Sequence, residues 1–163
     1  MTKLSICIPT FNRSKYLENC LNSIFIAQKK NKLSFEVCVS DNNSDDKITH
    51  IIKKYNKKIK LVFNRNKKNI GVAKNIIKSV SMAKGEFVWL LGNDDLVLPK
   101  SFKFLKKIFN KNPDVDFFYI NSFNIEKNIL IKSIYTLIQE KLIFQSLINS
   151  QILMKKEKKN FLN

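Results

Sequence analysis

Asn93, Asp94 and Asp95 follow the apolar segment Trp89-Leu90-Leu91 and a single glycine. Two adjacent carboxylates at the end of a buried strand are unfavourable unless a positive charge lies beside them. Mg²⁺ and Mn²⁺ prefer carboxylate oxygens and often complete their coordination shells with substrate phosphates. The triplet therefore predicts a site for a divalent cation and a diphosphate. An ordinary turn, with one aspartate capping the next helix, explains the same residues equally well.

Two further polar segments have side chains that suit a nucleotide. Residues 41–46 read Asp-Asn-Asn-Ser-Asp-Asp, and these groups can hydrogen-bond a nucleobase edge and ribose hydroxyls, although such clusters are more often turns and helix N-caps. Residues 69–75 place Gly71 at the start of a predicted helix, where free N–H groups and Lys74 suit a phosphate. The sequence has no EF-hand, GxGxxG or Walker A pattern, which argues against calcium, dinucleotide and P-loop sites.

The elements that must position these segments alternate along the chain. Short apolar segments predict strands at residues 3–8, 34–40, 59–63, 86–91 and 115–120, and apolar residues spaced at three and four predict helices at residues 14–28, 48–55, 72–82 and 99–109. This alternation indicates an α/β fold with a mainly parallel sheet and helices on both faces. Such sheets bind ligands at the carboxyl ends of their strands. We therefore expect Pro9-Thr10, Asp41-Asn42 and Asn93-Asp94-Asp95 to lie close together there.

Composition limits the class of protein. The 163 residues are 44% hydrophobic, which suits one folded unit and excludes a disordered chain. No apolar segment reaches the ~20 residues that span a bilayer, and residues 1–9 are too short for a signal peptide. Cys7, Cys20 and Cys38 form an odd set without CxxC spacing, so we expect reduced thiols and a cytoplasmic protein.

The charge balance is strongly basic. The formal net charge is +17, from 30 lysines and arginines against 13 acids. This excess favours polyanionic partners, namely nucleic acid, anionic lipid headgroups or phosphate-bearing small molecules, and a coding bias towards lysine explains it as well. The lysines are scattered and no RRM, KH or helix-turn-helix signature is present, which argues against specific nucleic-acid binding.

The C-terminal part differs in character. Apolar residues within segment 133–154 are spaced as in a helix, and the basic segment 155–159 follows. We therefore expect two parts, a domain of residues 1–124 that holds the predicted site and a helical C-terminal extension of residues 125–163 with a basic tail. The extension is expected either to pack on the sheet or to lie on an anionic membrane surface.

Four segments, in order and spacing, resemble the nucleotide-binding half of family 2 glycosyltransferases, which have the GT-A fold. The matching segments are residues 4–13, 36–46, 69–75 and 83–95, so the resemblance covers residue 1 to about residue 120. The form Trp-Leu-Leu-Gly-Asn-Asp-Asp is most similar to the branch that includes abequosyltransferase-type enzymes of surface polysaccharide assembly. The resemblance implies a Rossmann-like GT-A fold that is truncated after the donor-binding half.

The resemblance also implies roles for individual residues in binding a nucleotide sugar. Pro9 and Thr10 would line the base pocket, and Asp41 would bind the nucleobase edge. Lys74 and Asn75 would lie near the ribose or the diphosphate. The other residues of the implied site are Asn12, Arg13, Asn69, Gly71 and Asp94.

For the metal, the resemblance implies Asp95 as the preferred ligand of Mn²⁺ or Mg²⁺ and Asp94 as the second ligand. Where the family has a further acid upstream, this chain has Gly92 and Asn93. The family's catalytic base is a carboxylate far downstream, and no catalytic residue is assigned here because none of the late acids matches its motif. These acids are Asp114, Asp116, Glu126, Glu140 and Glu157.

The implied function is the transfer of a sugar from a nucleoside diphosphate sugar to a polysaccharide or lipid-linked acceptor. The implied location is the cytoplasm, with peripheral association at the inner face of the membrane. Two alternatives stay open: a non-catalytic remnant that retains only the fold, and, less favoured, a nucleic-acid-binding protein suggested by the net charge.

Overall fold

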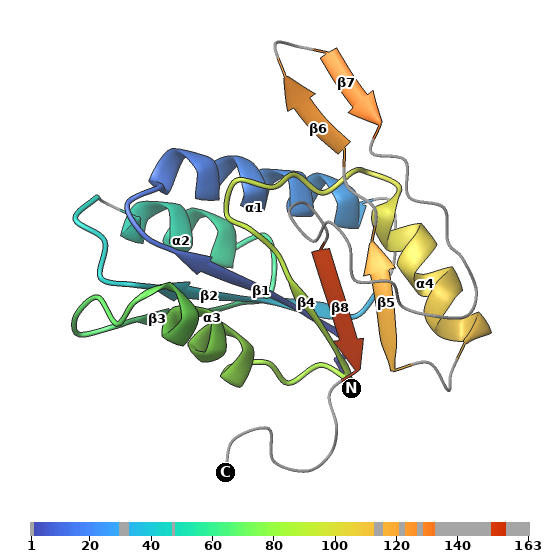
Figure 1. Cartoon of the computed structure of the whole chain (residues 1–163), viewed down its shortest axis with the longest axis horizontal. Helices are drawn as coiled ribbons and strands as arrows, with labels where there is room; N and C mark the ends of the chain where they lie inside the picture. Colours follow the sequence, from blue (N-terminus) through green and yellow to red (C-terminus); the bar gives the residue numbers. More distant parts are fainter. Residues whose placement is uncertain are drawn as a thin grey trace.

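The computed structural model of the chain describes residues 2–29, 33–46, 48–112, 116–120, 123–126, 129–132 and 151–155. Strands and helices alternate through most of this length (Figure 1). In chain order they are β1 (Leu4–Thr10), α1 (Ser14–Lys29), β2 (Phe35–Asp41), α2 (Thr49–Asn56), β3 (Leu61–Arg65), α3 (Val72–Ser81), β4 (Phe87–Leu90), α4 (Ser101–Lys111), β5 (Phe117–Ile120), β6 (Phe123–Glu126), β7 (Ile129–Lys132) and β8 (Gln151–Lys155).

A six-stranded sheet in the order β3-β2-β1-β4-β8-β5 forms the centre of the fold. Strands β1 to β4 run parallel, whereas β8 runs antiparallel to both β4 and β5. The register aligns polar residues, because Thr10 of β1 pairs with Asp41 of β2, and Asp41 pairs with Arg65 of β3. The carboxyl ends of these three strands therefore form one polar edge.

Helices cover both faces of the sheet, with α1, α2 and α4 on one face and α3 on the other (Figure 1). On the first face, alternate strand residues such as Ile6 share one apolar cluster with Leu17 of α1. The ring of Phe87 in β4 stacks on that of Phe109 in α4 with centroids 4.3 Å apart. The buried apolar layer on the α3 side is smaller and contains Cys7, Cys38, Ala83 and Val88. These two layers hold the helices against the sheet.

At the amino-terminal ends of the strands, which form the sheet edge opposite the polar one, the buried Glu36 holds the turn that precedes β4. Its Oε1 accepts hydrogen bonds from Ser5 Oγ (2.8 Å) and Lys84 N (2.7 Å), and Lys60 Nζ lies 3.1 Å from Oε2. Burial disfavours the charged carboxyl, but the hydrogen bonds from Lys84 and Ser5 and the charge of Lys60 outweigh it and lower the pKa of Glu36. Gly85 passes so close to β1 that a Cβ there would lie 2.6 Å from Ser5 N, which leaves room only for glycine.

The α/β fold with a mainly parallel sheet is confirmed, and each strand and helix predicted before residue 121 is present within a few residues of its predicted bounds. The helical C-terminal extension is wrong where the structure describes it, because the β6–β7 hairpin and β8 occupy those residues. A short apolar run such as Ile152-Leu153-Met154 fits a helix or a strand, and here pairing between β4 and β5 decides the outcome. Residues 133–150 and the basic tail beyond residue 155 lie outside the described residues.

Candidate functional site

The ends of β1, β2 and β4 are joined directly at Thr10, which is 2% exposed. The Thr10 carbonyl accepts a hydrogen bond from Asn42 N (2.9 Å), and the Thr10 hydroxyl accepts one from Asn93 Nδ2 (2.8 Å). Pro9 lies beside it in β1 and is half-buried. The three segments that the sequence placed at strand ends therefore do meet at one edge of the sheet.

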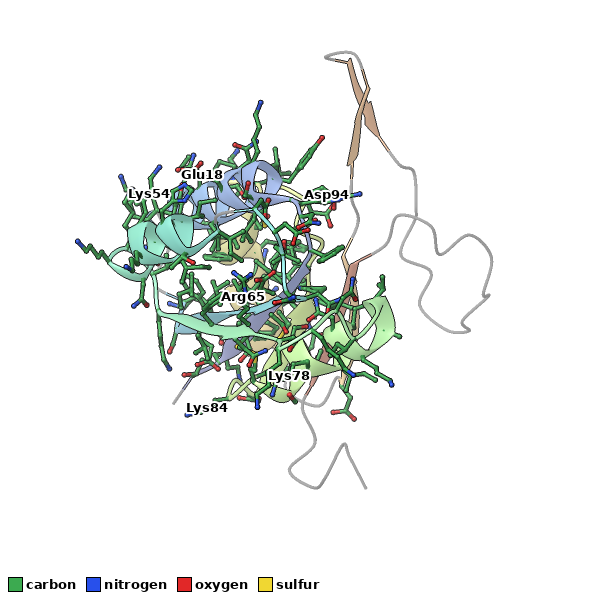
Figure 2. The ribbon with its side chains drawn as sticks, turned by 90° about the vertical axis from the view of Figure 1, so that its left-hand side faces the viewer. Glu18, Lys54, Arg65, Lys78, Lys84 and Asp94 are labelled. Atoms are coloured by element: carbon green, nitrogen blue, oxygen red, sulfur yellow. The ribbon has the colours of Figure 1, made fainter. Side chains whose placement is uncertain are left out.

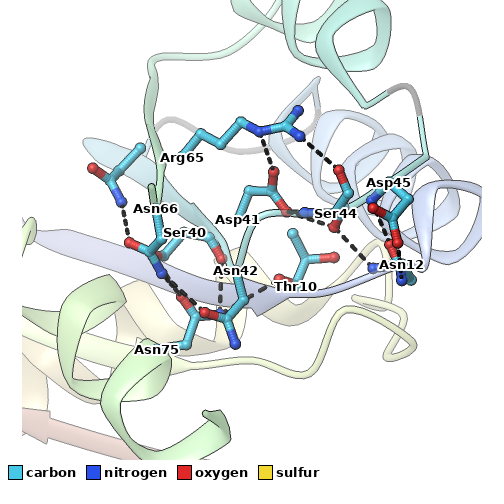
Figure 3. Close-up of polar contacts among 11 residues, drawn as sticks. Thr10, Asn12, Ser40, Asp41, Asn42, Ser44, Asp45, Arg65, Asn66 and Asn75 are labelled. Atoms are coloured by element: carbon cyan, nitrogen blue, oxygen red, sulfur yellow. Dashed lines mark hydrogen bonds and ion pairs between the residues drawn. The ribbon is translucent and has the colours of Figure 1, made fainter. Parts of the chain in front are cut away.

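Asp41 is a buried carboxylate at the centre of this edge (Figure 3). Its Oδ1 accepts hydrogen bonds from the amide and the hydroxyl of Ser44, at 3.1 and 2.5 Å. Its Oδ2 has no hydrogen-bond donor among the described residues and lies 3.6 Å from Nε of Arg65. The Arg65 guanidinium also donates to the Ser44 carbonyl (2.7 Å), so it covers Asp41 while remaining 44% exposed itself. One carboxylate oxygen of Asp41 thus holds the loop through Ser44, and the other faces the partly exposed guanidinium of Arg65.

Sequence reasoning missed Arg65 as a site residue. Part of the signal was available, since Arg65 is one of only two arginines in a lysine-rich chain and lies two residues after the strand predicted at residues 59–63. The structure extends that strand to Arg65, which pairs with Asp41. A hollow of about 420 Å³ adjoins its side chain and is lined by Asp45, Asp46, Thr49, His50, Lys53 and Arg65.

Asn75 of α3 is an internal tie between strands (Figure 3). The side chain is 3% exposed, and its oxygen accepts hydrogen bonds from Ser40 Oγ (2.8 Å) and Asn66 Nδ2 (3.0 Å). Its amide nitrogen donates to the carbonyls of Ser40 (3.0 Å) and Thr10 (3.4 Å). Because its hydrogen-bonding capacity is used inside the protein, Asn75 holds the binding edge together in this structure and does not present itself to a ligand.

The approach to α3 is set by Asn42 and Asn69. Asn42 Oδ1 accepts hydrogen bonds from Asn66 Nδ2 (3.1 Å) and Ile70 N (2.9 Å). Asn42 Nδ2 donates a hydrogen bond to Asn69 Oδ1 (2.7 Å). Asn69 Oδ1 also accepts a hydrogen bond from Gly71 N (2.9 Å). Gly71 has φ +83°, a backbone conformation that favours glycine. These contacts fix the first turn of α3 at the polar edge.

The loops after β1 and β2 are cross-linked by Asn12. Its backbone N–H donates to Ser44 Oγ (2.8 Å), and its side-chain oxygen accepts from Asp45 N (2.7 Å). Asp46 Oδ2 accepts from Ser14 N (2.6 Å) and so satisfies a free donor at the start of α1. The polar segment 41–46 therefore does serve as turn and cap, while it also carries the buried Asp41.

The carboxylates of Asp94 and Asp95 converge over Gly92. A Cβ at Gly92 would lie 2.7 Å from Asp95 Oδ2 and 2.9 Å from Asp94 Oδ1. Gly92 N donates to Asp95 Oδ2 (3.0 Å), while Arg13 Nη1 donates to Asp94 Oδ2 (2.7 Å). Cys20 of α1 lies beneath this turn, with Sγ 3.8 Å from the Gly92 carbonyl. Burial raises the pKa of the Cys20 thiol, and the negative charges of Asp95 and Asp94 raise it further.

This turn fits a divalent cation that is shared with a ligand. Two carboxylates present oxygens around one small space that only glycine leaves open, and Mg²⁺ or Mn²⁺ is commonly held by one or two carboxylates together with substrate phosphates. Within the described part of the chain, no group of three or more His, Cys, Asp or Glu residues could hold a metal ion, so this turn offers two carboxylates at most. Asn93 is 7% exposed, and its amide is bonded to Thr10.

Sequence and structure comparisons identify similar proteins. The model of the family "Glycosyl transferase family 2" matches residues 5–160. Abequosyltransferase RfbV of Salmonella typhimurium is 38% identical over 114 residues, which cover 69% of this chain and 34% of that protein. A GalNAc(5)-diNAcBac-PP-undecaprenol beta-1,3-glucosyltransferase of Campylobacter jejuni is 38% identical over 101 residues, or 60% of this chain and 31% of that protein.

Two solved structures have a similar fold. TarS of Staphylococcus aureus in complex with UDP superposes with a TM-score of 0.63 at 31% identity, over 69% of this chain and 33% of that one. A mannosyltransferase of Pyrobaculum calidifontis in complex with GDP-Man and Mn²⁺ gives a TM-score of 0.60 at 20% identity, over 73% of this chain and 34% of that one, and shows likeness of fold alone. The chain spans about a third of the length of these relatives.

Proposed function

The chain belongs to glycosyltransferase family 2, and on that premise we propose that it binds a nucleoside diphosphate sugar at the carboxyl edge of its sheet, for transfer of the sugar to a saccharide or lipid-linked acceptor. The observation that carries the proposal is the pair of hydrogen bonds at Thr10. They bring the buried Asp41 and the Asp94–Asp95 turn to one edge, as a ligand with a base at one end and a diphosphate at the other requires. The relatives named for UDP and for an undecaprenol-linked saccharide support the ligand classes.

Asp41 and Arg65 form the proposed base site. Asp41 Oδ2 can accept a hydrogen bond once the exposed Arg65 guanidinium turns aside, and Arg65 can donate to a carbonyl of the base. Uracil and guanine have a ring N–H next to a carbonyl, whereas the corresponding cytosine nitrogen is an acceptor. This pair therefore favours uracil or guanine donors over cytosine donors.

Asp95 and Asp94 are the proposed ligands of Mn²⁺ or Mg²⁺, together with oxygens of the diphosphate. A bound cation would act as a Lewis acid that offsets the negative charge on the leaving diphosphate. The N–H groups in the first turn of α3 and the exposed Lys74 add positive charge on the side of Asn75.

Titration calorimetry tests this proposal with Asp95→Asn. The amide keeps an acceptor for the Gly92 N–H, so the turn should stay folded while the ligand charge is lost. We expect UDP and GDP to bind the unchanged chain better with Mn²⁺ than without it, and CDP to bind more weakly. Asp95→Asn should weaken nucleotide binding in Mn²⁺ at least about tenfold, since a lost contact to a charged group costs about 1.5–3 kcal/mol. Glu18→Gln removes a half-buried acid that pairs with Lys54 elsewhere, and it should leave nucleotide binding unchanged. Equal affinity of Asp95→Asn and the unchanged chain would contradict the proposal.

Location at the cytoplasmic face of a membrane is part of the proposal. Among the described residues, no helix is both long and apolar enough to cross a bilayer. The exposed face of α4 could instead lie against anionic lipid, since residues 96–112 contain five lysines, no acid and the 58%-exposed Phe104.

Vesicle cosedimentation tests that surface. Binding to phosphatidylglycerol-containing vesicles should fall when four α4 lysines become glutamine, and should fall less for a matched set around α3. The two sets are Lys103, Lys106, Lys107 and Lys111 against Lys67, Lys68, Lys78 and Lys84. Equal loss in both sets would show that only the overall charge matters.

A further inference from the structure

Only two of the 30 basic residues are arginines, and each lies against an aspartate of the candidate site. Arg13 Nη1 is 2.7 Å from Asp94 Oδ2, and Arg65 Nε is 3.6 Å from Asp41 Oδ2. Elsewhere lysines pair with acids, as Lys54 does with Glu18. Arginine differs from lysine because its planar fork matches both carboxylate and phosphate oxygens. This placement suggests a role that a lysine would not perform as well.

Arg13 is held so that its guanidinium can exchange partners. It precedes α1, lies 5.8 Å from the centroid of the Tyr16 ring, and is 51% exposed, while Asp94 is 50% exposed. Exposed ion pairs contribute little to stability, so a competing partner can displace one at small cost. The Tyr16 ring keeps the displaced guanidinium near the turn.

Arg13 also offsets the negative charge of the carboxylate turn. Asp94 and Asp95 place carboxylate oxygens around the same point at Gly92, where like charges repel. With no cation present, the guanidinium supplies the positive charge that Asp94 lacks. A divalent cation at the same carboxylates would take over this role and leave Arg13 without its partner.

We propose that Arg13 is the counter-ion of Asp94 as long as no divalent cation is bound. When the cation binds the carboxylates, Arg13 gives way and its guanidinium turns to the donor diphosphate. This inference rests on the proposed function and assigns a positioning role to a residue outside the carboxylate turn. It requires that the divalent cation and the nucleotide diphosphate each strengthen the binding of the other, because cation binding releases the Arg13 guanidinium that the diphosphate uses. Such coupling is reciprocal.

Mn²⁺ binding in the absence of nucleotide, measured by electron paramagnetic resonance, tests the proposal without any activity assay. Arg13→Gln should bind Mn²⁺ about threefold to fivefold more tightly than the unchanged chain, because the competing charge is gone. With Mn²⁺ present, the same variant should bind UDP more weakly than the unchanged chain does. The factor by which Mn²⁺ raises the affinity for UDP, and UDP the affinity for Mn²⁺, should therefore fall. Arg13→Lys should keep the ordinary Mn²⁺ affinity and lose part of the coupling, since it keeps the charge but not the fork.

Lys54→Gln is the matched control. It breaks an ion pair of similar length (2.6 Å) and exposure that lies apart from Asp94 (Figure 2), and it should leave both affinities unchanged. Unchanged or weaker Mn²⁺ binding by Arg13→Gln would overturn the inference alone. Absence of Mn²⁺ binding by the unchanged chain, even with UDP, would contradict the proposed function and the inference together.

Discussion

Replacing Asn75 by alanine removes the side chain that ties three strands at the binding edge. The substitution deletes the bonds to Ser40 Oγ, the Ser40 carbonyl and Asn66, all 3.0 Å or shorter, and a longer one to the Thr10 carbonyl. The site is 3% exposed, so water cannot readily replace these partners. We therefore expect a loss of stability together with a looser binding edge.

The size of the loss follows from the geometry. Three good hydrogen bonds contribute about 1 kcal/mol each, and buried partners left unsatisfied add about 1–3 kcal/mol. Alanine favours the helix over asparagine by roughly 0.5 kcal/mol and offsets part of the cost. The free energy of unfolding should fall by about 3.5–5.5 kcal/mol. With a urea m-value of about 2 kcal/mol/M, the unfolding midpoint should drop by about 2–3 M.

Urea unfolding followed by circular dichroism measures this loss, and UDP titration in Mn²⁺ under conditions where the variant is folded measures the loosened edge. Asn22→Ala is the matched control, since Asn22 is an exposed helical asparagine of α1 and its loss should change stability by less than about 0.5 kcal/mol. A decrease below ~1 kcal/mol for Asn75→Ala, or undiminished UDP affinity, would show that the buried amide does not organise the site.

Two other predictions concern the opposite edge of the sheet. Gly85→Ala should lower the free energy of unfolding by about 1–3 kcal/mol, because its Cβ would meet the backbone of Leu4 and Ser5, and thermal unfolding that matches the unchanged chain would contradict this close approach. The lowered pKa of Glu36 contributes stability that is present above its unfolded-state value of 4.5 and is lost as pH falls through the lower folded-state value. Urea unfolding from pH 6 to pH 3 should therefore show a decline that Glu36→Gln makes shallower, and equal slopes would speak against the role of this carboxyl.

The sequence was sufficient to predict the order of elements up to residue 120, because their signals are local. The segment Leu4–Ile8, for example, is short, apolar and rich in β-branched residues, as buried strands are, and it lies within β1. The same local signals placed Thr10, Asp41 and Asp94 at carboxyl ends, and a parallel sheet then brings them together.

The strand β8 could not be predicted in this way. Its residue Ile152 continues a spacing typical of a helix, and the deciding partner is β4, more than 60 residues earlier in the chain. Non-local pairing of this kind leaves no trace in a window of neighbouring residues.

The hydrogen bonds and ion pairs between side chains of the site also could not be predicted from the sequence pattern. Asn75 belongs to a segment that suggests ligand contact, yet its hydrogen bonds are made inside the protein. The pairs Arg13–Asp94 and Arg65–Asp41 depend on how loops cross in space. Residue types and spacing predicted where the site lies, whereas the division between framework and ligand-facing residues required the structure.

We propose that a cation and a diphosphate meet at the edge where Thr10, Asp41 and the carboxylate turn converge. Paramagnetic broadening by Mn²⁺ in an amide NMR spectrum of the UDP-bound chain tests this meeting point. Signals of Gly92, Asp94, Asp95 and Thr10 should disappear first, while those of Glu36 and Gly85 at the other edge should persist. Preferential loss of signals at that other edge, or uniform broadening across the chain, would contradict it.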